Sequence, residues 1–360
     1  MEDEGKSQQV FDTKTIFTIG SEVTSKVICS VPFRSPDGED LIAIGCAEGI
    51  WVGCRNDPQS LRRVLLVKKL SQFAILEDIG IFVVLADKAL YAYHIEALFS
   101  ASPSHQQASQ RAYQISERKK DVHYFNGGYV QGRRLIVYVK SGSLSSTFYI
   151  LEADIPRISS SESGWFKSYK KFYIPRETHD VIFLNTKLAV LHIKGVDVLD
   201  PFDLQTMTIP SKDDFKSVVD SKLRSSFRPL GMFRVPGDPE SDKDEFLICY
   251  SNFGLYLDSL GEPTRSKPVV SWGVEVQHAA LLNSSYIALF SRQSVEIRGL
   301  YNGEVTQVIK GKDVRCVWDG RVTTIADPHD AAVDRPRALG MMNSEEIPGC
   351  QKVFEVLPVG

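Results

Sequence analysis

The sequence lacks paired cysteines, long hydrophobic segments and a large excess of either charge. Six cysteines occur among 360 residues and none forms a CxxC pair, which argues for buried, reduced thiols rather than a zinc or disulfide framework. The most apolar stretch, residues 41–54, is short and contains Glu48, so it is not expected to span a bilayer of about 30 Å. A formal net charge of −3 gives no basic field, so nucleic-acid binding is not expected.

The sequence also lacks the local signatures of common catalytic and metal sites. It contains no GxSxG elbow, no HExxH pair and no Walker loop. No two of the seven histidines are close enough in sequence to suggest a pair of metal ligands. Residues 327–330 offer two carboxylates and an imidazole, but Pro328 makes a turn the better interpretation. We therefore expect no catalytic residue, no metal and no cofactor.

Short apolar segments joined by tight polar turns make up most of the chain. The clearest example is residues 73–98, where the runs 81–85 and 89–95 are rich in Val, Ile, Phe, Tyr and Leu. Six such units have turns near positions 47, 87, 142, 194, 252 and 292. Their mean spacing of about 49 residues matches a four-stranded propeller blade, so the chain holds about seven blades.

The two ends of the chain provide a means of closing this ring. Thr15–Ile19 is a candidate strand with no hairpin partner nearby, and Lys352–Leu357 is another. We predict that both lie in the last blade, so that the N-terminal and C-terminal strands pair. The predicted fold is thus an all-β, seven-bladed propeller that occupies residues 1–360 as a single domain, with 1–13 and roughly 327–347 as loop or flexible segments.

One amphipathic helix is predicted near residues 213–227. Its apolar side chains fall on one helical face. They are Phe215, Val218, Val219, Leu223 and Phe227. Such a helix either covers a gap between blades at the rim or docks a partner.

Candidate contact residues for a partner come from the predicted turns and loops. They are Lys88, Trp165, Phe166, Arg228, Arg234 and Trp272. Trp165 and Phe166 follow a Ser/Gly-rich loop, where an aromatic pair either forms an exposed contact site or folds back against its blade. Arg228 and Arg234 flank residues 229–233 and either contact a partner or anchor the blade.

Basic residues occur in five small clusters. These are Arg62–Arg63, Lys68–Lys69, Arg118–Lys120, Arg133–Arg134, and Lys167 with Lys170–Lys171. Clusters of this kind are typical of solvated strand ends. The third and fifth flank aromatic-rich strands, which leaves binding to an anionic membrane open.

Several of these segments resemble a known family. Gly45–Val52 followed by Ala86–Leu98 resembles the citron homology (CNH) domain. Arg228–Val235 followed by Glu245–Leu257 is similar to the version found in fungal Rho guanine-nucleotide exchange factors. Three shorter segments fit the same version, namely Ser271–Gly273, Val295–Arg298 and Val308–Gly311. The resemblance spans roughly residues 14–315, and the tail after 315 is less recognisable.

The resemblance implies a seven-bladed propeller that acts as a regulatory, protein-binding module near the C-terminal side of a larger protein. In the fungal factors a catalytic helical domain and a pleckstrin-like domain precede it, and neither is visible in this chain. This implies a fragment that is not an enzyme and does not itself exchange nucleotide. The expected partner is a small Rho-family GTPase, another signalling protein at the cell cortex, or the factor's own catalytic half, in cell-wall integrity signalling.

Two other functions compete with this interpretation. The first is a module that binds phosphoinositides at a membrane surface and localises the exchange factor to the cell cortex. The second is a propeller enzyme with a site at the mouth of the central channel, for which the sequence supplies no paired acids. In the leading interpretation and in the first of these, the expected location is the cytoplasm, with recruitment to the plasma membrane. The acidic start at Met1–Gly5 is unlike a secretory signal.

Overall fold

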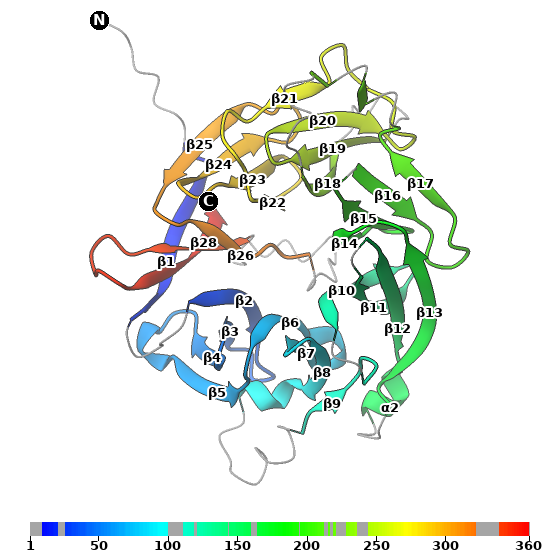
Figure 1. Cartoon of the computed structure of the whole chain (residues 1–360). Helices are drawn as coiled ribbons and strands as arrows, with labels where there is room; N and C mark the ends of the chain where they lie inside the picture. Colours follow the sequence, from blue (N-terminus) through cyan, green and yellow to red (C-terminus); the bar gives the residue numbers. More distant parts are fainter. Residues whose placement is uncertain are drawn as a thin grey trace, which may run out of the picture.

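The strands form seven four-stranded antiparallel sheets arranged around one axis (Figure 1). This computed structural model describes residues 9–20, 26–99, 111–118, 121–142, 144–159, 164–193, 195–211, 215–216, 219–220, 228–235, 244–321 and 338–359. The prediction of an all-β propeller with seven blades is confirmed. No helix in this described part of the chain is long and apolar enough to cross a membrane.

In blades 1 to 6 the first strand lies nearest the axis and the fourth lies at the periphery (Figure 1). Blade 1 contains β2 (Val27–Arg34), β3 (Asp40–Cys46), β4 (Gly49–Cys54) and β5 (Arg62–Leu66). Blade 2 contains β6 (Leu70–Leu76), β7 (Ile81–Ala86), β8 (Ala89–His94) and β9 (Tyr113–Gln114). Blade 3 contains β10 (Val122–Val130), β11 (Arg133–Ser141), β12 (Ser146–Ala153) and β13 (Phe166–Ile174), and the short helix α2 (Ile155–Ser159) precedes β13.

The remaining blades follow the same order. Blade 4 contains β14 (Thr178–Phe183), β15 (Leu188–His192), β16 (Gly195–Leu199) and β17 (Thr206–Ile209). Blade 5 contains β18 (Pro229–Val235), β19 (Glu245–Tyr250), β20 (Phe253–Asp258) and β21 (Val269–Ser271). Blade 6 contains β22 (His278–Leu281), β23 (Tyr286–Phe290), β24 (Ser294–Gly299) and β25 (Val305–Lys310). Blade 7 contains β26 (Arg315–Trp318), β27 (Ala338–Asn343), β28 (Gln351–Pro358) and β1 (Phe11–Ile19).

Burial on both faces explains why the strands read as continuous apolar runs. Every residue of β7 is buried. Phe82 and Val84 face the core shared with blade 1, whereas Ile81 and Val83 face the core shared with blade 3. A sheet covered on both sides needs apolar residues at every position rather than at alternate ones.

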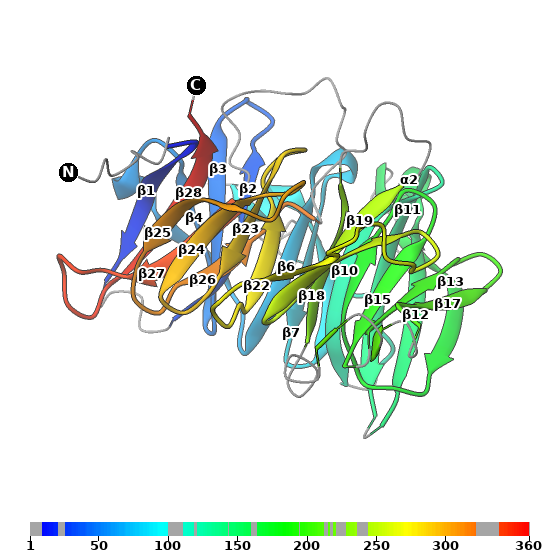
Figure 2. The ribbon, with the colours of Figure 1, turned by 90° about the horizontal axis from the view of Figure 1, so that it is seen from above.

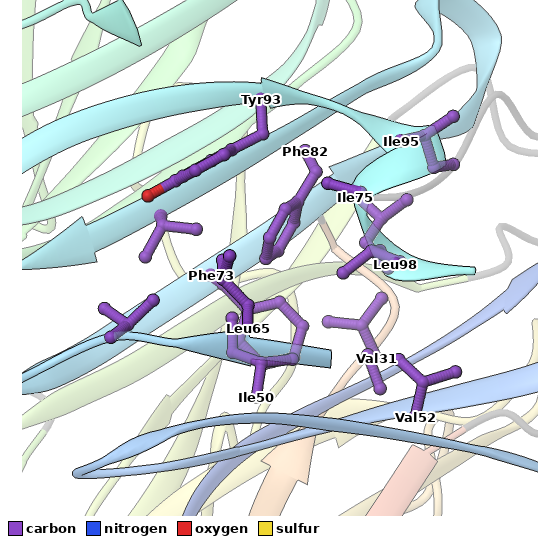
Figure 3. Packing of buried hydrophobic residues seen from close by; sticks show 14 of the residues in the cluster. Val31, Ile50, Val52, Leu65, Phe73, Ile75, Phe82, Tyr93, Ile95 and Leu98 are labelled. Carbon is purple, nitrogen blue, oxygen red and sulfur yellow. The ribbon is translucent and has the colours of Figure 1, made fainter. Parts of the chain in front are cut away.

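The core between blades 1 and 2 shows how neighbouring blades pack (Figure 3). The labelled side chains from the two blades point toward one another between the sheets. They are Val31, Ile50, Val52 and Leu65 of blade 1 and Phe73, Ile75, Phe82, Tyr93, Ile95 and Leu98 of blade 2. The rings of Phe73 and Phe82 meet edge to face with centroids 5.6 Å apart, an arrangement that aromatic pairs favour.

Blade 7 is built from both ends of the chain, as predicted. β1 pairs with β28 in antiparallel register from Phe11 opposite Pro358 to Ile19 opposite Gln351, and the two strands lie side by side (Figures 1 and 2). Side chains of both neighbouring blades reinforce this pairing. The side-chain oxygen of Gln307 in blade 6 accepts the amide of Phe11 at 3.0 Å. Arg55 of blade 1 forms a 2.7 Å ion pair with the fully buried Glu355.

Two segments expected to be loops contain strand residues. β1 begins at Phe11, inside the predicted flexible segment 1–13, and β27 occupies Ala338–Asn343 within the segment 327–347. β27 pairs with both β26 and β28, so its backbone hydrogen bonds come from tertiary pairing rather than from strong local strand propensity. The rest of both predicted segments lies partly outside the described residues.

The predicted helix is described only in part. The amide of Phe215 donates to the carbonyl of Ser211 and the amide of Val219 to that of Phe215, both at 3.0 Å, which is helical geometry. Phe215 and Val219 pack into the core between blades 4 and 5, near Tyr250. These positions fit the covering role. Val218, Leu223 and Phe227 lie outside the described residues.

Candidate interaction surface

The six predicted contact residues lie on three different blades and do not form one site. Lys88 is exposed in the turn between β7 and β8, where Asp87 and Lys88 both have positive φ. Arg228 is exposed just before β18, and Arg234 within β18 pairs with Asp244. Trp165, Phe166 and Trp272 belong to blades 3 and 5. For the accessible residues Lys88, Phe166, Arg228 and Arg234, contact with a partner stays a prediction.

Of the two interpretations of Trp165 and Phe166, the tryptophan fits the second, because it folds back and is not an exposed contact. Trp165 is 2% exposed, and its ring centroid lies 4.3 Å from those of both His94 and Tyr113 in blade 2. Gly164 has a φ of 89°, a conformation that glycine adopts readily and that turns the chain back toward the blade. Phe166 is half-buried and begins β13.

Trp272 is likewise an interior residue rather than a surface contact. It is 3% exposed, and its indole N–H donates to the carbonyl of Tyr250 at 2.9 Å. The guanidinium of Arg298 lies 5.0 Å from the ring centroid and also donates to the carbonyl of Trp272 at 3.0 Å. Since ring and backbone are both engaged, Trp272 holds blade 5 against blade 6.

A half-buried polar cluster joins four blades near the axis of the ring. After β26 the chain runs toward the middle of the propeller (Figure 1). There the guanidinium of Arg321 pairs with Asp180 of β14 at 2.8 Å and with Asp319 at 2.9 Å. It also donates to the carbonyls of Leu230 in β18 and Ala279 in β22, at 3.2 and 2.7 Å. We call this set, with His278, the axial cluster.

Burial and neighbouring charges shift the pKa values of three residues in the axial cluster. Burial opposes ionisation of Asp319, but Arg321 and His278 hold the pKa of that carboxyl below its ordinary value. Burial alone would lower the pKa of His278, yet Cys316 and the Asp319 carboxylate, 2.8 Å away, outweigh it and raise the pKa to about 10. Burial also raises the pKa of Asp180 despite its pairing with Arg321. The ionised groups of the axial cluster therefore compensate one another's charge. This arrangement is typical of a structural clamp between blades.

The raised pKa of His278 predicts a pH-dependent contribution to stability. Protonated His278 stabilises the folded state fully below its ordinary pKa of about 6.5, and the contribution is lost as pH rises through the folded value. We expect the unfolding free energy of the native chain to exceed that of a His278→Gln variant most at low pH. The difference should shrink between pH ~6.5 and ~10 in urea titrations. A difference that does not change with pH would contradict this assignment.

The outer strand of blade 3 offers a different kind of surface. β13 has nine residues, against two in β9 and four in β17, the outer strands of the neighbouring blades. One edge of β13 pairs with β12, and the other has no strand partner among the residues that the structure describes. Both Figure 1 and Figure 2 place β13 at the periphery. This free edge is long enough to hydrogen-bond another chain.

The side chains of β13 are basic and aromatic. The strand reads Phe-Lys-Ser-Tyr-Lys-Lys-Phe-Tyr-Ile and contains no acidic residue. The side chains of Lys167 and Lys171 are 67% and 57% exposed, and Tyr173 is 61% exposed. Lys167 pairs with Asp154 at 2.7 Å, whereas Lys171 lies 4.0 Å from Glu117.

The model of the CNH domain family matches residues 38–320. The chain belongs to the CNH domain family. Among curated proteins it is 27% identical over 331 residues to Rho1 guanine nucleotide exchange factor 2 of Schizosaccharomyces pombe, covering 88% of this chain and 27% of that protein. It is 30% identical over 305 residues to Rho1 guanine nucleotide exchange factor 1 of the same yeast, covering 79% of this chain and 21% of that protein. The chain thus spans about a quarter or less of these relatives.

A solved structure agrees with the family assignment. The AfRom2 CNH domain superposes with a TM-score of 0.74 at 25% sequence identity, covering 96% of this chain and 98% of that one. The resemblance to a CNH domain of fungal Rho exchange factors is confirmed. The structural match covers 96% of the chain, whereas the family model ends at residue 320, before β27 and β28 of blade 7.

Sequence reasoning partly missed the free edge of this CNH domain. The sequence shows Lys167, Lys170 and Lys171 as a basic cluster and Phe166 as a candidate contact, but it does not show that they share a strand with a free edge. The signal that marks the strand is three lysines and two tyrosines in nine residues without one carboxylate. The axial cluster has no local signal, since Arg321 and Asp180 are 141 residues apart.

Proposed function

We propose that this CNH domain is the non-catalytic, regulatory interaction domain of a Rho-type guanine-nucleotide exchange factor. The observation that carries the proposal is the match to two Rho1 exchange factors, of which the chain spans 27% and 21%. A propeller covering a small part of such factors fits a module that controls exchange carried out elsewhere in the protein. Its closed ring presents many loops and strand edges to partners.

The proposed partner is a small Rho-family GTPase, another signalling protein at the cell cortex, or the exchange factor's own catalytic half. The names of the relatives support the first of these, because both are factors for Rho1. The proposed setting is cell-wall integrity signalling, with the protein in the cytoplasm and recruited to the cortex.

Protein partners are favoured over a lipid surface because basic side chains of the clusters form ion pairs with carboxylates of the same chain. Lys69 pairs with Asp87 at 2.9 Å, and Arg134 pairs with Asp78 at 3.2 Å. Lys167 pairs with Asp154. Positive charge interleaved with carboxylates attracts an anionic membrane weakly, since that attraction is worth about 1 kcal/mol for each basic residue near the surface. Phosphoinositide binding remains the alternative function.

Removing this domain from the complete exchange factor tests the proposal. We expect the exchange rate on its GTPase, or the amount of factor at the cortex, to change by about fivefold or more, the usual size of regulatory coupling. The isolated domain should retain a Rho GTPase or an upstream signalling protein in a pull-down. Unchanged exchange and localisation, with no retained partner, would contradict the proposal. Salt-sensitive sedimentation with phosphoinositide vesicles alone would favour the membrane alternative.

A further inference from the structure

We propose that the free edge of β13 binds an extended, acidic segment of a partner protein, which adds to blade 3 as a fifth strand. This inference rests on the proposed interaction function and specifies the surface and chemistry of the contact. It requires an exposed edge, a length sufficient for stable pairing, and side chains that select one kind of strand.

The first two requirements are met by the backbone of β13. Its residues are paired to β12 from Phe166 opposite Ala153 to Ile174 opposite Ser146, with one irregularity near Ile150. In an antiparallel sheet the amides and carbonyls of an edge strand that do not face its neighbour point outward and remain available. Nine residues exceed the five to six of an average strand. Main-chain pairing of this kind gives affinity in many peptide-binding domains.

The lysines of β13 decide what kind of strand can pair there. Lys167, Lys170 and Lys171 place three positive charges on the strand, and it carries no negative one. Carboxylates of neighbouring segments compensate part of this charge, since Lys167 pairs with Asp154 at 2.7 Å and Lys171 lies 4.0 Å from Glu117. Both lysine side chains are still more than half exposed, so they can also contact a carboxylate of a partner strand. A second copy of the chain pairing edge to edge would bring these lysines together, and like charges across strands are destabilising. Lysines on an edge strand therefore prevent self-association. They oppose a partner strand only if it is basic, and they attract one that carries Glu or Asp.

Aromatic residues on β13 supply contact area beside these charges. Tyr173 is 61% exposed. Phe172 stacks on Phe148 with centroids 4.7 Å apart, and Tyr169 meets Phe202 edge to face at 5.8 Å. These half-buried rings are held rigidly, so they lose little entropy when a neighbouring strand covers them. The surface thus combines main-chain hydrogen bonds, selective charge and preformed apolar contacts.

A peptide of about ten residues that alternates glutamate with valine tests the proposal. We expect it to bind the 360-residue chain and to slow hydrogen exchange of amides within residues 166–174 by about tenfold or more, because outward amides become hydrogen-bonded. The same peptide with alternate amides N-methylated keeps its charge but loses donors. It should bind about tenfold more weakly.

A charge-reversed protein and a matched control define the surface. Lys167→Glu, Lys170→Glu and Lys171→Glu together should weaken peptide binding by about tenfold or more. Arg62→Glu, Arg63→Glu and Lys68→Glu change the net charge equally at blade 1 and should alter binding by about twofold at most. Two results would overturn the inference: an equal loss of peptide affinity in both proteins, or undiminished binding of the N-methylated peptide. Either would mean that the peptide binds only by non-specific electrostatic attraction.

Two further outcomes separate this inference from the proposed function. If deleting the domain changes exchange but the triple β13 variant behaves as the native factor, the regulatory function stands and the β13 site is wrong. If anionic vesicles, but not the acidic peptide, bind in a manner that the triple variant abolishes, the strand is a membrane contact and the inference is overturned.

Discussion

A chain that lacks residues 1–20, and with them β1, will not form a stable folded monomer. β1 buries Phe11, Ile16, Phe17 and Ile19 to 4% exposure or less. Burial of four such side chains contributes about 6–12 kcal/mol, which is similar to the whole stability of a typical domain of about 5–15 kcal/mol. In urea titrations followed by far-UV circular dichroism, the shortened chain should show no cooperative unfolding transition. In size-exclusion chromatography it should elute as aggregates.

The control for this deletion is a chain that begins at residue 9 and keeps all of β1. It should unfold at the same urea concentration as the complete chain. Adding a synthetic peptide of residues 9–20 to the shorter protein should restore part of the cooperative transition, since the edge of β28 is then covered. A stable, cooperatively unfolding monomer without β1 would show that the ring does not depend on its terminal pairing.

Replacing Arg321 with alanine should destabilise the protein by at most about 3–5 kcal/mol. That is the cost of removing one partner of a fully buried ion pair, and Arg321 is 12% exposed while Asp180 is 29% exposed. The substitution leaves Asp180 and Asp319 without their shared cation and the carbonyls of Leu230 and Ala279 without a donor. Because these groups come from blades 4 to 7, the loss should weaken the ring as a whole. Urea denaturation measures the effect.

Two other arginine variants make this prediction specific. Arg34→Ala removes an arginine that is 45% exposed and pairs with Asp40, and it should cost at most about 1 kcal/mol. Arg321→Lys keeps the charge but cannot reach four acceptors with one ammonium group, so its stability should lie between the native protein and Arg321→Ala. Equal small effects at positions 321 and 34 would mean that the axial cluster is not a clamp.

The fold was predictable because each blade repeats one local pattern. Runs such as residues 81–85 are apolar at every position since blades pack against both faces of each sheet, and the regular spacing of turns reveals the repeat. The pairing of the two chain ends followed from strands without hairpin partners. β27 has no clear signal in the sequence because Ala338, Gly340 and Asn343 are residue types with low strand propensity.

The candidate surface was less predictable because sequence does not specify where a side chain points. Trp165 and Trp272 follow polar segments that suggest exposure, yet His94 and Tyr113 enclose the first and Arg298 covers the second. Arg321 gains its role only when the ring brings blades 4, 5 and 6 around it. Such arrangements depend on closure of the propeller, which no local motif encodes.

Sharing of blade 7 between the two ends of the chain has a consequence for biosynthesis. β1 leaves the ribosome well before β28, and at about 5–20 residues per second the interval lasts roughly 20–70 s. Throughout that time the backbone of β1 has no strand to pair with, although Ile16, Phe17 and Ile19 can already pack against apolar residues of blade 1. The nascent protein therefore depends on chaperones or on transient contacts until β28 emerges. Only then can β1 pair with β28 and the propeller close.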